Sequence, residues 1–325
     1  MDAMTHFRPP RWLRGRHAQT VWGSIFRMPI RLPLHHQRLD LPDGDFIDLD
    51  VLDGITPASP VVVVCHGLEG SSKAGYVRGL LRDLRAHGVG AVAINFRGCS
   101  GEPNRLPRFY HSGDTGDLAY VVDTLRAQCP GRALGLAGFS LGGNVVAKYL
   151  GERGDTVPSE VRAAAVVSVP FDLAMCARNL DAPDLMARVY RERFLRRLRA
   201  KVARKARMHA SMPLDKARAA RTFRDWDHDV TAPLHGFTSA EDYWTRSSAG
   251  PLLPSVKRPM LILAAEDDPF VPPEALPREA AAQNPLLQLE ISREGGHVAF
   301  VHGPPWSTRR HAERRAAEFL VEKLQ

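Results

Sequence analysis

Runs of consecutive apolar residues alternate with stretches of helical spacing from residue 60 onward. The run Val61–Cys65 is continuous and mostly β-branched, which is typical of a strand buried on both faces. Helical spacing of apolar residues predicts helices at 75–87 and 114–128. Further strands are predicted at 91–96, 133–139 and 163–169. Such repeated strand–helix units predict an α/β fold with a largely parallel central sheet flanked by helices.

This alternation is interrupted between residues 170 and 256, where the chain is basic, helical and punctuated by prolines. It resumes with predicted strands at Met260–Ala265 and 288–291 and a last predicted helix at 308–324. The interruption predicts a helical cap at 171–255, inserted between two parts of one core at 36–170 and 256–325.

The chain before residue 36 has a different character. Residues 1–35 are rich in proline and arginine and predict an irregular arm that packs on the core. The turn sequence Pro-Asp-Gly-Asp at 42–45 then separates two short runs at 37–41 and Phe46–Leu52. This pattern predicts an antiparallel hairpin.

The composition narrows the class of protein. A chain of 325 residues with 44% hydrophobic and 25% charged residues fits one folded α/β core with a cap rather than a disordered chain. The N-terminus lacks the apolar core of a signal peptide, and no run approaches the roughly 20 apolar residues that span a bilayer. Four cysteines without C-x-x-C spacing favour a reduced protein over a disulfide scaffold. We therefore expect a cytoplasmic protein.

The strongest chemical signal is the motif Gly-Phe-Ser-Leu-Gly at 138–142, a complete G-x-S-x-G. In hydrolases this motif places the serine on a strained turn between a strand and a helix. Here the predicted strand at 133–139 enters the motif and a predicted helix at 143–151 leaves it. This context favours Ser140 as a nucleophile over a structural serine in a tight turn.

A serine nucleophile needs a base, and in this arrangement the acid and then the histidine follow it along the chain. His297 lies in Gly-Gly-His at 295–297, after a predicted strand and before the last helix. The other histidines that follow Ser140 fit less well, and His311, in helical sequence, is expected to be solvated. The competitors weighed against His297 are His228, His235, His302 and His311.

The acid is expected after the strand Met260–Ala265, where Glu266, Asp267 and Asp268 follow one another. Its work is to orient the histidine and to stabilise the imidazolium. We choose Asp268, because Pro269 ends the strand directly after it. Asp267 stays open as an alternative.

The oxyanion of the reaction needs two backbone N–H donors fixed in advance. One is expected from Leu141, the residue after the nucleophile. The other is expected from the loop after Val61–Cys65, with Leu68 preferred over Gly67. His66 precedes Ser140 in the chain and is expected to support this loop rather than to act as the base.

These motifs resemble a known family. His-Gly-Leu at 66–68, Asn-Phe-Arg-Gly at 95–98 and the serine motif are shared by many α/β-hydrolases. Four further segments resemble the YheT-like branch, whose eukaryotic relatives are lipases: RWLRGRHAQT at 11–20, YHSGDT at 110–115, TAPLHGF at 231–237 and DDPF at 267–270. The resemblance spans nearly the whole chain. It implies the α/β-hydrolase fold and carboxylic-ester hydrolysis, with Ser140, Asp268 and His297 as the charge-relay residues.

The cap carries the unusual charge of this chain. The net charge is +8, and ten of the 44 Lys and Arg residues fall within 188–207, a stretch more arginine-rich than the family implies. Apolar residues spaced by four predict an amphipathic helix there: Met186, Tyr190, Phe194, Leu198 and Val202. We favour a helix packed on the core with a solvated basic face over weak docking to an anionic membrane.

Other partners and chemistries find no support in the sequence. No helix-turn-helix, zinc or RRM pattern accompanies the charge, so nucleic acid is not expected. No H-E-x-x-H motif or His/Cys cluster predicts a metal, and no cofactor is expected. The resulting hypothesis is a serine esterase that cleaves a small-molecule or lipid ester through an acyl-enzyme on Ser140. The alternative is a non-catalytic scaffold that binds a hydrophobic ligand or a partner; the oligomeric state stays open.

Overall fold

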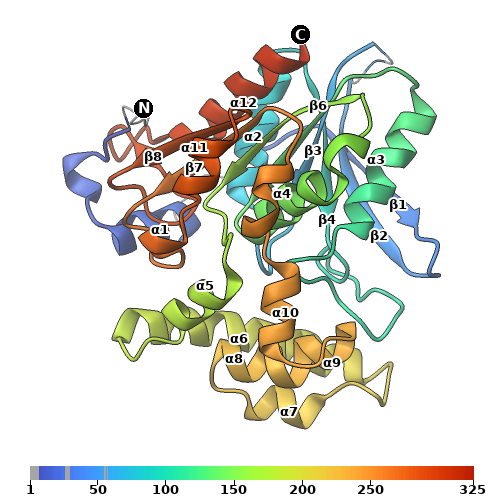
Figure 1. Ribbon diagram of the computed structural model, residues 1–325, viewed down its shortest axis with the longest axis vertical. Helices are drawn as coiled ribbons and strands as arrows, with labels where there is room; N and C mark the ends of the chain where they lie inside the picture. The colour runs from blue at the N-terminus through green and yellow to red at the C-terminus, as the bar shows by residue number, and fades with distance from the viewer. Residues whose placement is uncertain (1–6, 26–29, 55, 57) are drawn as a thin grey trace.

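The computed structural model describes residues 7–25, 30–54, 56 and 58–325. Within them, one eight-stranded sheet has the order β1-β2-β4-β3-β5-β6-β7-β8 (Figure 1). The strands are β1 (Leu34–Asp40), β2 (Phe46–Leu52), β3 (Val61–Cys65), β4 (Gly90–Asn95), β5 (Leu134–Phe139), β6 (Val161–Val167), β7 (Met260–Ala265) and β8 (Leu287–Ser292). β1 and β2 form the predicted antiparallel hairpin. β2 also runs antiparallel to β4, and the other neighbouring strands are parallel.

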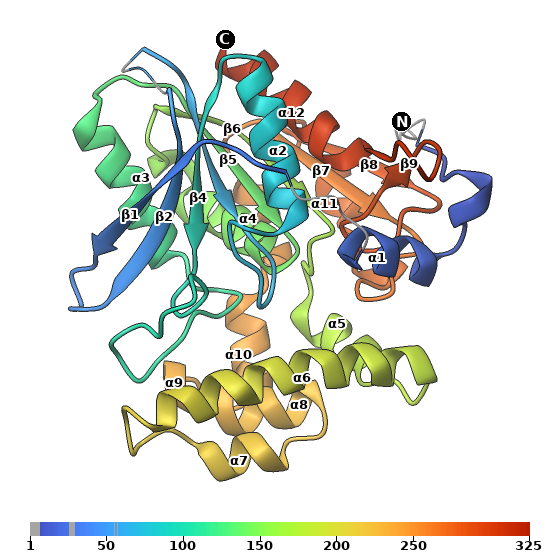
Figure 2. The ribbon, with the colours of Figure 1, turned by 180° about the vertical axis from the view of Figure 1, so that it is seen from behind.

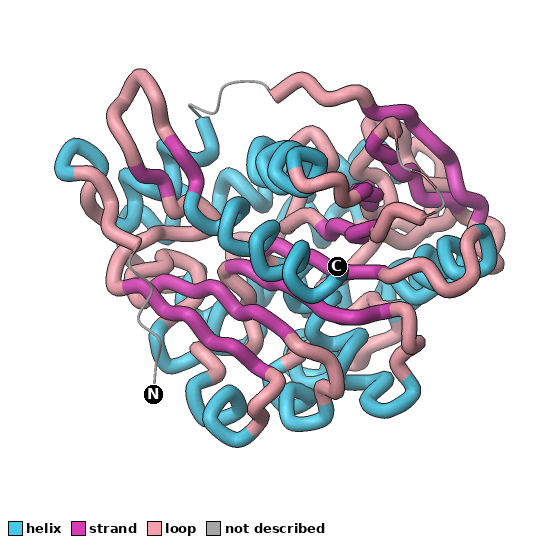
Figure 3. The backbone as a smooth tube through the Cα atoms, turned by 90° about the horizontal axis from the view of Figure 1, so that it is seen from above, coloured by secondary structure: helices cyan, strands magenta, loops and turns pink. Residues whose placement is uncertain are grey.

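Helices cover both faces of this sheet, as Figure 3 shows from above. They are α2 (Gly75–Ala86), α3 (Gly116–Gln128), α4 (Leu141–Arg153), α11 (Arg278–Gln283) and α12 (His311–Leu324). In β3, Val61 and Val63 belong to the same buried cluster as α3 and α4, whereas Val62 and Val64 belong to that of α2 and α12. The continuous apolar run is thus buried on both sides, and each valine contributes about 1.5–3 kcal/mol to folding.

The fully described stretch between β6 and β7 contains six α-helices, here called the cap helices. They are α5 (Leu173–Leu180), α6 (Leu185–Ala206), α7 (Leu214–Ala219), α8 (Phe223–Trp226), α9 (Ala232–His235) and α10 (Ala240–Ser247). They gather at one side of the core; α6 crosses in front of α8 in Figure 2, and α7 lies farther from the core. Because β5 and β6 both end toward this side, loops at the carboxyl edge of the sheet face the cap helices.

The longest cap helix, α6, begins where the Asp184 carboxylate accepts hydrogen bonds from the N–H groups of Met186 and Ala187. Its expected basic face is solvated only in part. The Lys205 side chain is buried, and its ammonium donates to the carbonyl and side-chain oxygens of Asn104 in the core, which offsets the cost of its burial. Burial lowers the pKa of Lys205 to about 8. The cap is therefore joined to the core through buried cations as well as apolar contacts.

The N-terminal segment is more regular than the sequence suggested. Residues 16–25 form the helix α1 (Arg16–Ile25), preceded by a 3₁₀ turn at Arg11–Leu13, so the prediction of an irregular arm was wrong over this stretch. The helix is anchored by polar contacts and by Trp22, which packs against a buried apolar cluster that includes Ala299. The buried Gln19 amide donates to the carbonyl oxygens of Leu13 and Val301 and accepts from the N–H of Val301. Residues 1–6 and 26–29 of the arm lie outside the described residues.

The remaining elements are short. β9 (Val301–His302) pairs antiparallel with β10 (Arg309–Arg310) just before α12. One-turn 3₁₀ helices lie at Gly154–Thr156 and Pro273–Ala275, and a longer one at Gly250–Ser255. Among the described residues, no helix combines the length and the apolar character needed to cross a bilayer.

Candidate active site

Ser140 occupies a sharp turn between the end of β5 and the start of α4. Its backbone has φ 53° and ψ −122°, a conformation that costs about 1–3 kcal/mol for a residue with a side chain. The glycines on either side make this turn possible. A Cβ added to Gly138 would lie 2.4 Å from the Gly142 carbonyl oxygen, and one added to Gly142 would lie 2.4 Å from that of His66. The strand, turn and helix predicted from the G-x-S-x-G motif are therefore present.

A continuous chain of hydrogen bonds joins the predicted serine, histidine and acid. The Ser140 hydroxyl lies 2.9 Å from His297 Nε2. On the other side of the ring, His297 Nδ1 lies 2.8 Å and 3.1 Å from the two carboxylate oxygens of Asp268. Asp268 is buried, and one of its oxygens also accepts from the N–H groups of Phe270 and Val271. A carboxylate held in this way favours the tautomer with its proton on Nδ1, leaving Nε2 as the acceptor facing serine.

Asp267 faces away from this chain but supports the same loop. Its Oδ1 accepts from the N–H of Gly296, 2.9 Å away, and burial raises its pKa above the usual range. The two neighbouring carboxylates therefore have separate contacts. Asp268 meets the imidazole of His297, while Asp267 meets the backbone before it.

Two hydroxyl groups that the sequence reasoning missed also hold the histidine loop. Thr20 Oγ1, on α1, accepts from the N–H of His297 at 2.9 Å, and Ser168 Oγ, after β6, accepts from that of Val298 at 3.0 Å. Gly296 has a φ of 60°, and a Cβ there would lie 2.7 Å from Thr20 Oγ1. The one sequence signal for Thr20 is its place in the RWLRGRHAQT segment. That pattern does not indicate that Thr20 contacts His297.

The second loop, at 66–70, is held by side chains on both sides of Leu68. Tyr76 Oη accepts from the N–H of Gly67 at 3.0 Å, and Tyr110 Oη accepts from that of Glu69 at 2.7 Å. Among the described residues, the N–H of Leu68 between them has no protein acceptor. Leu68 and Leu141 both lie beside Ser140 in the wall of the same cavity.

His66 has the supporting position expected of it. Its Nδ1 lies 2.7 Å from the Gly67 carbonyl oxygen, and its Nε2 accepts from the N–H of Phe96. Complete burial lowers its pKa to about 4, so the ring is neutral at pH 7. With both nitrogens occupied by backbone groups, His66 fixes the loop and contacts no reacting atom.

The competing histidines lie elsewhere. His228 is exposed, and His302 lies in the short strand β9. The expectation that His311 is solvated was wrong: it is half-buried beside the Phe7 ring at 5.4 Å, and burial lowers its pKa to about 4. His235 is the one of these four that lines the cavity of Ser140.

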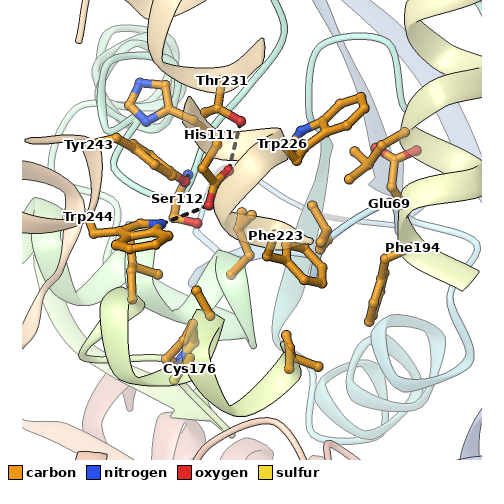
Figure 4. Close-up of a pocket in the computed structure, with 18 of the residues that line it drawn as sticks. Glu69, His111, Ser112, Cys176, Phe194, Phe223, Trp226, Thr231, Tyr243 and Trp244 are labelled. Atoms are coloured by element: carbon orange, nitrogen blue, oxygen red, sulfur yellow. Dashed lines mark hydrogen bonds between the residues drawn. The ribbon is translucent and has the colours of Figure 1, made fainter. Parts of the chain in front are cut away.

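The cavity above Ser140 has a volume of about 150 Å³ and lies between the core and the cap helices. Its wall is largely aromatic and aliphatic, with Phe194, Phe223, Trp226, Tyr243 and Trp244 around the space in Figure 4. One carboxylate faces it from the cap. The two oxygens of Asp227 accept from Thr231 Oγ1 and Trp244 Nε1, and burial raises its pKa to about 7. Among the described residues, no group of three or more His, Cys, Asp or Glu side chains is arranged to hold a metal ion.

Comparison with known proteins places this geometry in a family. The model of the alpha/beta hydrolase fold matches residues 60–304. The chain belongs to the α/β-hydrolase family. It is 36% identical to the candidate esterase YheT of Escherichia coli, over all of this chain and 95% of that protein. The resemblance to the YheT-like branch is thereby confirmed along the whole length.

Two further relatives of this α/β-hydrolase carry lipase names. Phospholipase ABHD3 of Mus musculus is 30% identical, covering 91% of this chain and 74% of that protein. Monoacylglycerol lipase of Saccharomyces cerevisiae is 31% identical, covering 82% of this chain and 59% of that protein. Among solved structures, the Pyrococcus furiosus esterase Pf2001 matches with a TM-score of 0.59 at 17% identity, over 99% of this chain and 100% of the other. That structural likeness concerns the fold alone.

Proposed function

We propose that the protein is a serine hydrolase that cleaves a carboxylic ester through an acyl-enzyme on Ser140. The observation that carries this proposal is the hydrogen-bonded chain from Ser140 Oγ through His297 to Asp268. Similarity to proteins named esterase, phospholipase and monoacylglycerol lipase supports ester hydrolysis from an independent direction.

In the first half of the reaction, Ser140 Oγ attacks the carbonyl carbon while its proton passes to His297 Nε2. The carbonyl π electrons move to oxygen, where the N–H groups of Leu68 and Leu141 would stabilise the developing charge. Asp268 stabilises the imidazolium that forms. Collapse of the intermediate breaks the bond to the leaving alcohol, which takes the proton from His297.

In the second half, water enters and gives a proton to His297 Nε2 as its oxygen attacks the acyl carbon. The same two N–H groups of Leu68 and Leu141 would hold the oxyanion again. The bond to Ser140 then breaks, the serine oxygen recovers its proton from His297, and the carboxylic acid leaves. The residues thus return to their starting protonation states.

The lining of the cavity and the cap helices beside it indicate the substrate class. A largely aromatic and aliphatic wall favours the acyl chain of a small-molecule or lipid ester over a charged group. In this proposal, residues 171–255 act as the cap that closes this space, residues 36–170 and 256–325 form the catalytic core, and the N-terminal arm packs on that core.

A fluorophosphonate probe tests the proposal because it forms a covalent bond with an activated serine. We expect labelling of the purified protein at Ser140, located by peptide mass spectrometry, and loss of labelling and of p-nitrophenyl ester turnover in Ser140→Ala. Ser112 and Ser168 are folded-core serines whose peptides serve as internal controls. Labelling elsewhere, or none in folded protein, would contradict the proposal and favour a non-catalytic scaffold.

A further inference from the structure

Two hollow spaces meet at Ser140 and His297. The first is the cavity between the core and the cap helices. The second is a groove of about 260 Å³ between α1, the loop after β3 and α6, and it shares Ser140 and His297 with the cavity. An ester has two sides, acyl and alcohol, so the two spaces offer a separate place for each.

The walls of the two spaces differ in charge. The cavity is lined mostly by apolar and aromatic side chains, and Lys201, its one cation besides histidines, is paired with Glu69. The groove wall also has apolar side chains, but it adds two guanidinium groups, Arg193 and Arg197. Glu69 lines both spaces, and Lys201 neutralises it. Because Arg193 and Arg197 are four positions apart on α6, they lie on one face of that helix.

These two arginines differ from most cations of α6 in having no partner. Arg199 pairs with Glu192, Lys201 pairs with Glu69, and Lys205 donates to Asn104. Arg191 and Arg204 donate to backbone carbonyl oxygens. Within the part of the chain that the structure describes, neither Arg193 nor Arg197 makes an ion pair or a hydrogen bond with a protein group.

We propose that the groove binds an anionic group, a phosphate or a carboxylate, carried on the alcohol side of the ester. This inference rests on the proposed serine hydrolase. Guanidinium groups match planar or tetrahedral oxyanions through paired N–H donors. Placing that charge in the apolar cavity would cost several kcal/mol without compensation, so the acyl chain takes the cavity and the charged alcohol takes the groove.

The test compares two soluble esters that differ only in the charge of the alcohol: hexanoylglycerol phosphate and hexanoylglycerol, both kept monomeric. We expect wild-type protein to have the higher kcat/KM for the phosphate ester, and the ratio of the two values to fall about tenfold in the double variant Arg193→Gln/Arg197→Gln. The preference should also weaken as salt is added, because Arg197 is exposed and salt screens exposed charges.

Arg196→Gln is the matched control. Arg196 lies on the same helix, is exposed and lines neither space, so its variant should keep the wild-type ratio. Equal losses in Arg196→Gln and in the double variant would overturn the inference, because they would indicate a general effect of helix charge. Retention of the ratio in the double variant would overturn it as well. In that case turnover of hexanoylglycerol and probe labelling would still stand, which separates this failure from failure of the proposed function.

Two further measurements separate binding from turnover and a substrate site from a membrane-binding site. Calorimetric binding of both compounds to Ser140→Ala gives a readout without turnover, and equal affinities there would reject the groove. Repeating the kinetics with added anionic vesicles distinguishes a substrate site from recruitment of the protein to a membrane surface. If the two arginines matter only with vesicles, they recruit the protein to a membrane, and the inference is wrong.

Discussion

Lys201, on the cap helix α6, donates to the Glu69 carboxylate at 2.5 Å, in the loop that carries Leu68. Both side chains are largely withdrawn from solvent, with 14% and 8% exposure. Tyr110 connects the pair to the backbone, because its hydroxyl donates to Glu69 Oε1 and accepts from the N–H of Glu69. Glu69 also has a φ of 53°. The cap and the proposed oxyanion loop are thus joined by one ion pair.

Breaking this pair on one side is expected to be costly. In Lys201→Met the Glu69 carboxylate would stay buried without its cation, so we expect a loss of about 3–5 kcal/mol in the free energy of unfolding, measured in urea. Ester turnover should fall with it as the loop loses its support. The double variant Lys201→Met/Glu69→Gln removes both charges and should recover much of the stability. Lys216→Met is the control, since its pair with Asp229 is exposed. Equal stability of Lys201→Met and Lys216→Met would show that the pair contributes little.

Substitution of the two neighbouring aspartates should lower kcat by very different factors. Asp268→Asn is expected to lower kcat on the order of 10⁴-fold, because the amide favours the wrong imidazole tautomer in His297. In Asp267→Asn the side-chain oxygen can still accept from the N–H of Gly296, so the loss should stay below about tenfold. Steady-state turnover of one p-nitrophenyl ester by both variants decides the matter. A larger loss at Asp267 would reverse the assignment.

Thr20 offers a way to disturb His297 without touching its side chain. Thr20→Val removes the acceptor of the His297 N–H and should lower kcat about tenfold with little change in KM, because a misplacement of about 1 Å can cost about 10²-fold. Thr20→Ser keeps the hydroxyl and should restore most of the rate. If valine and serine behave alike, the contact does not position the histidine.

The contrast between Ser140 and Thr20 shows what could be predicted from sequence. Ser140, its flanking glycines and the strand and helix around it form one local pattern, and the order of Asp268 and His297 follows from the strand–helix alternation. Thr20 meets His297 across 277 positions, and Lys201 meets Glu69 across 132. No periodicity encodes such pairs. They depend on how α1 and the cap helices dock after the sheet has formed.

The sequence could not decide between Asp267 and Asp268 as the acid, and the reason is different. Both follow the same buried strand, and consecutive residues in a turn direct their side chains to different neighbours. The path of the loop at 295–298 determines which carboxylate meets an imidazole and which meets an N–H. That path depends in turn on Thr20 and Ser168. Composition and spacing give the cluster of acids, and tertiary contacts select between its members.

Asp227 should make stability depend on pH. Burial raises its folded-state pKa from 3.8 to about 7, so the folded protein holds a proton that the unfolded chain has released over this interval. The unfolded state then binds fewer protons, and the free energy of unfolding falls as pH rises from about 4 to about 7. Asp227→Asn stays neutral and can still accept from Trp244 and bond Thr231, which should flatten the dependence. Urea unfolding at several pH values measures it, with the 98% exposed Asp215→Asn as control. A slope in Asp227→Asn equal to that of wild type would assign the pH dependence to other groups.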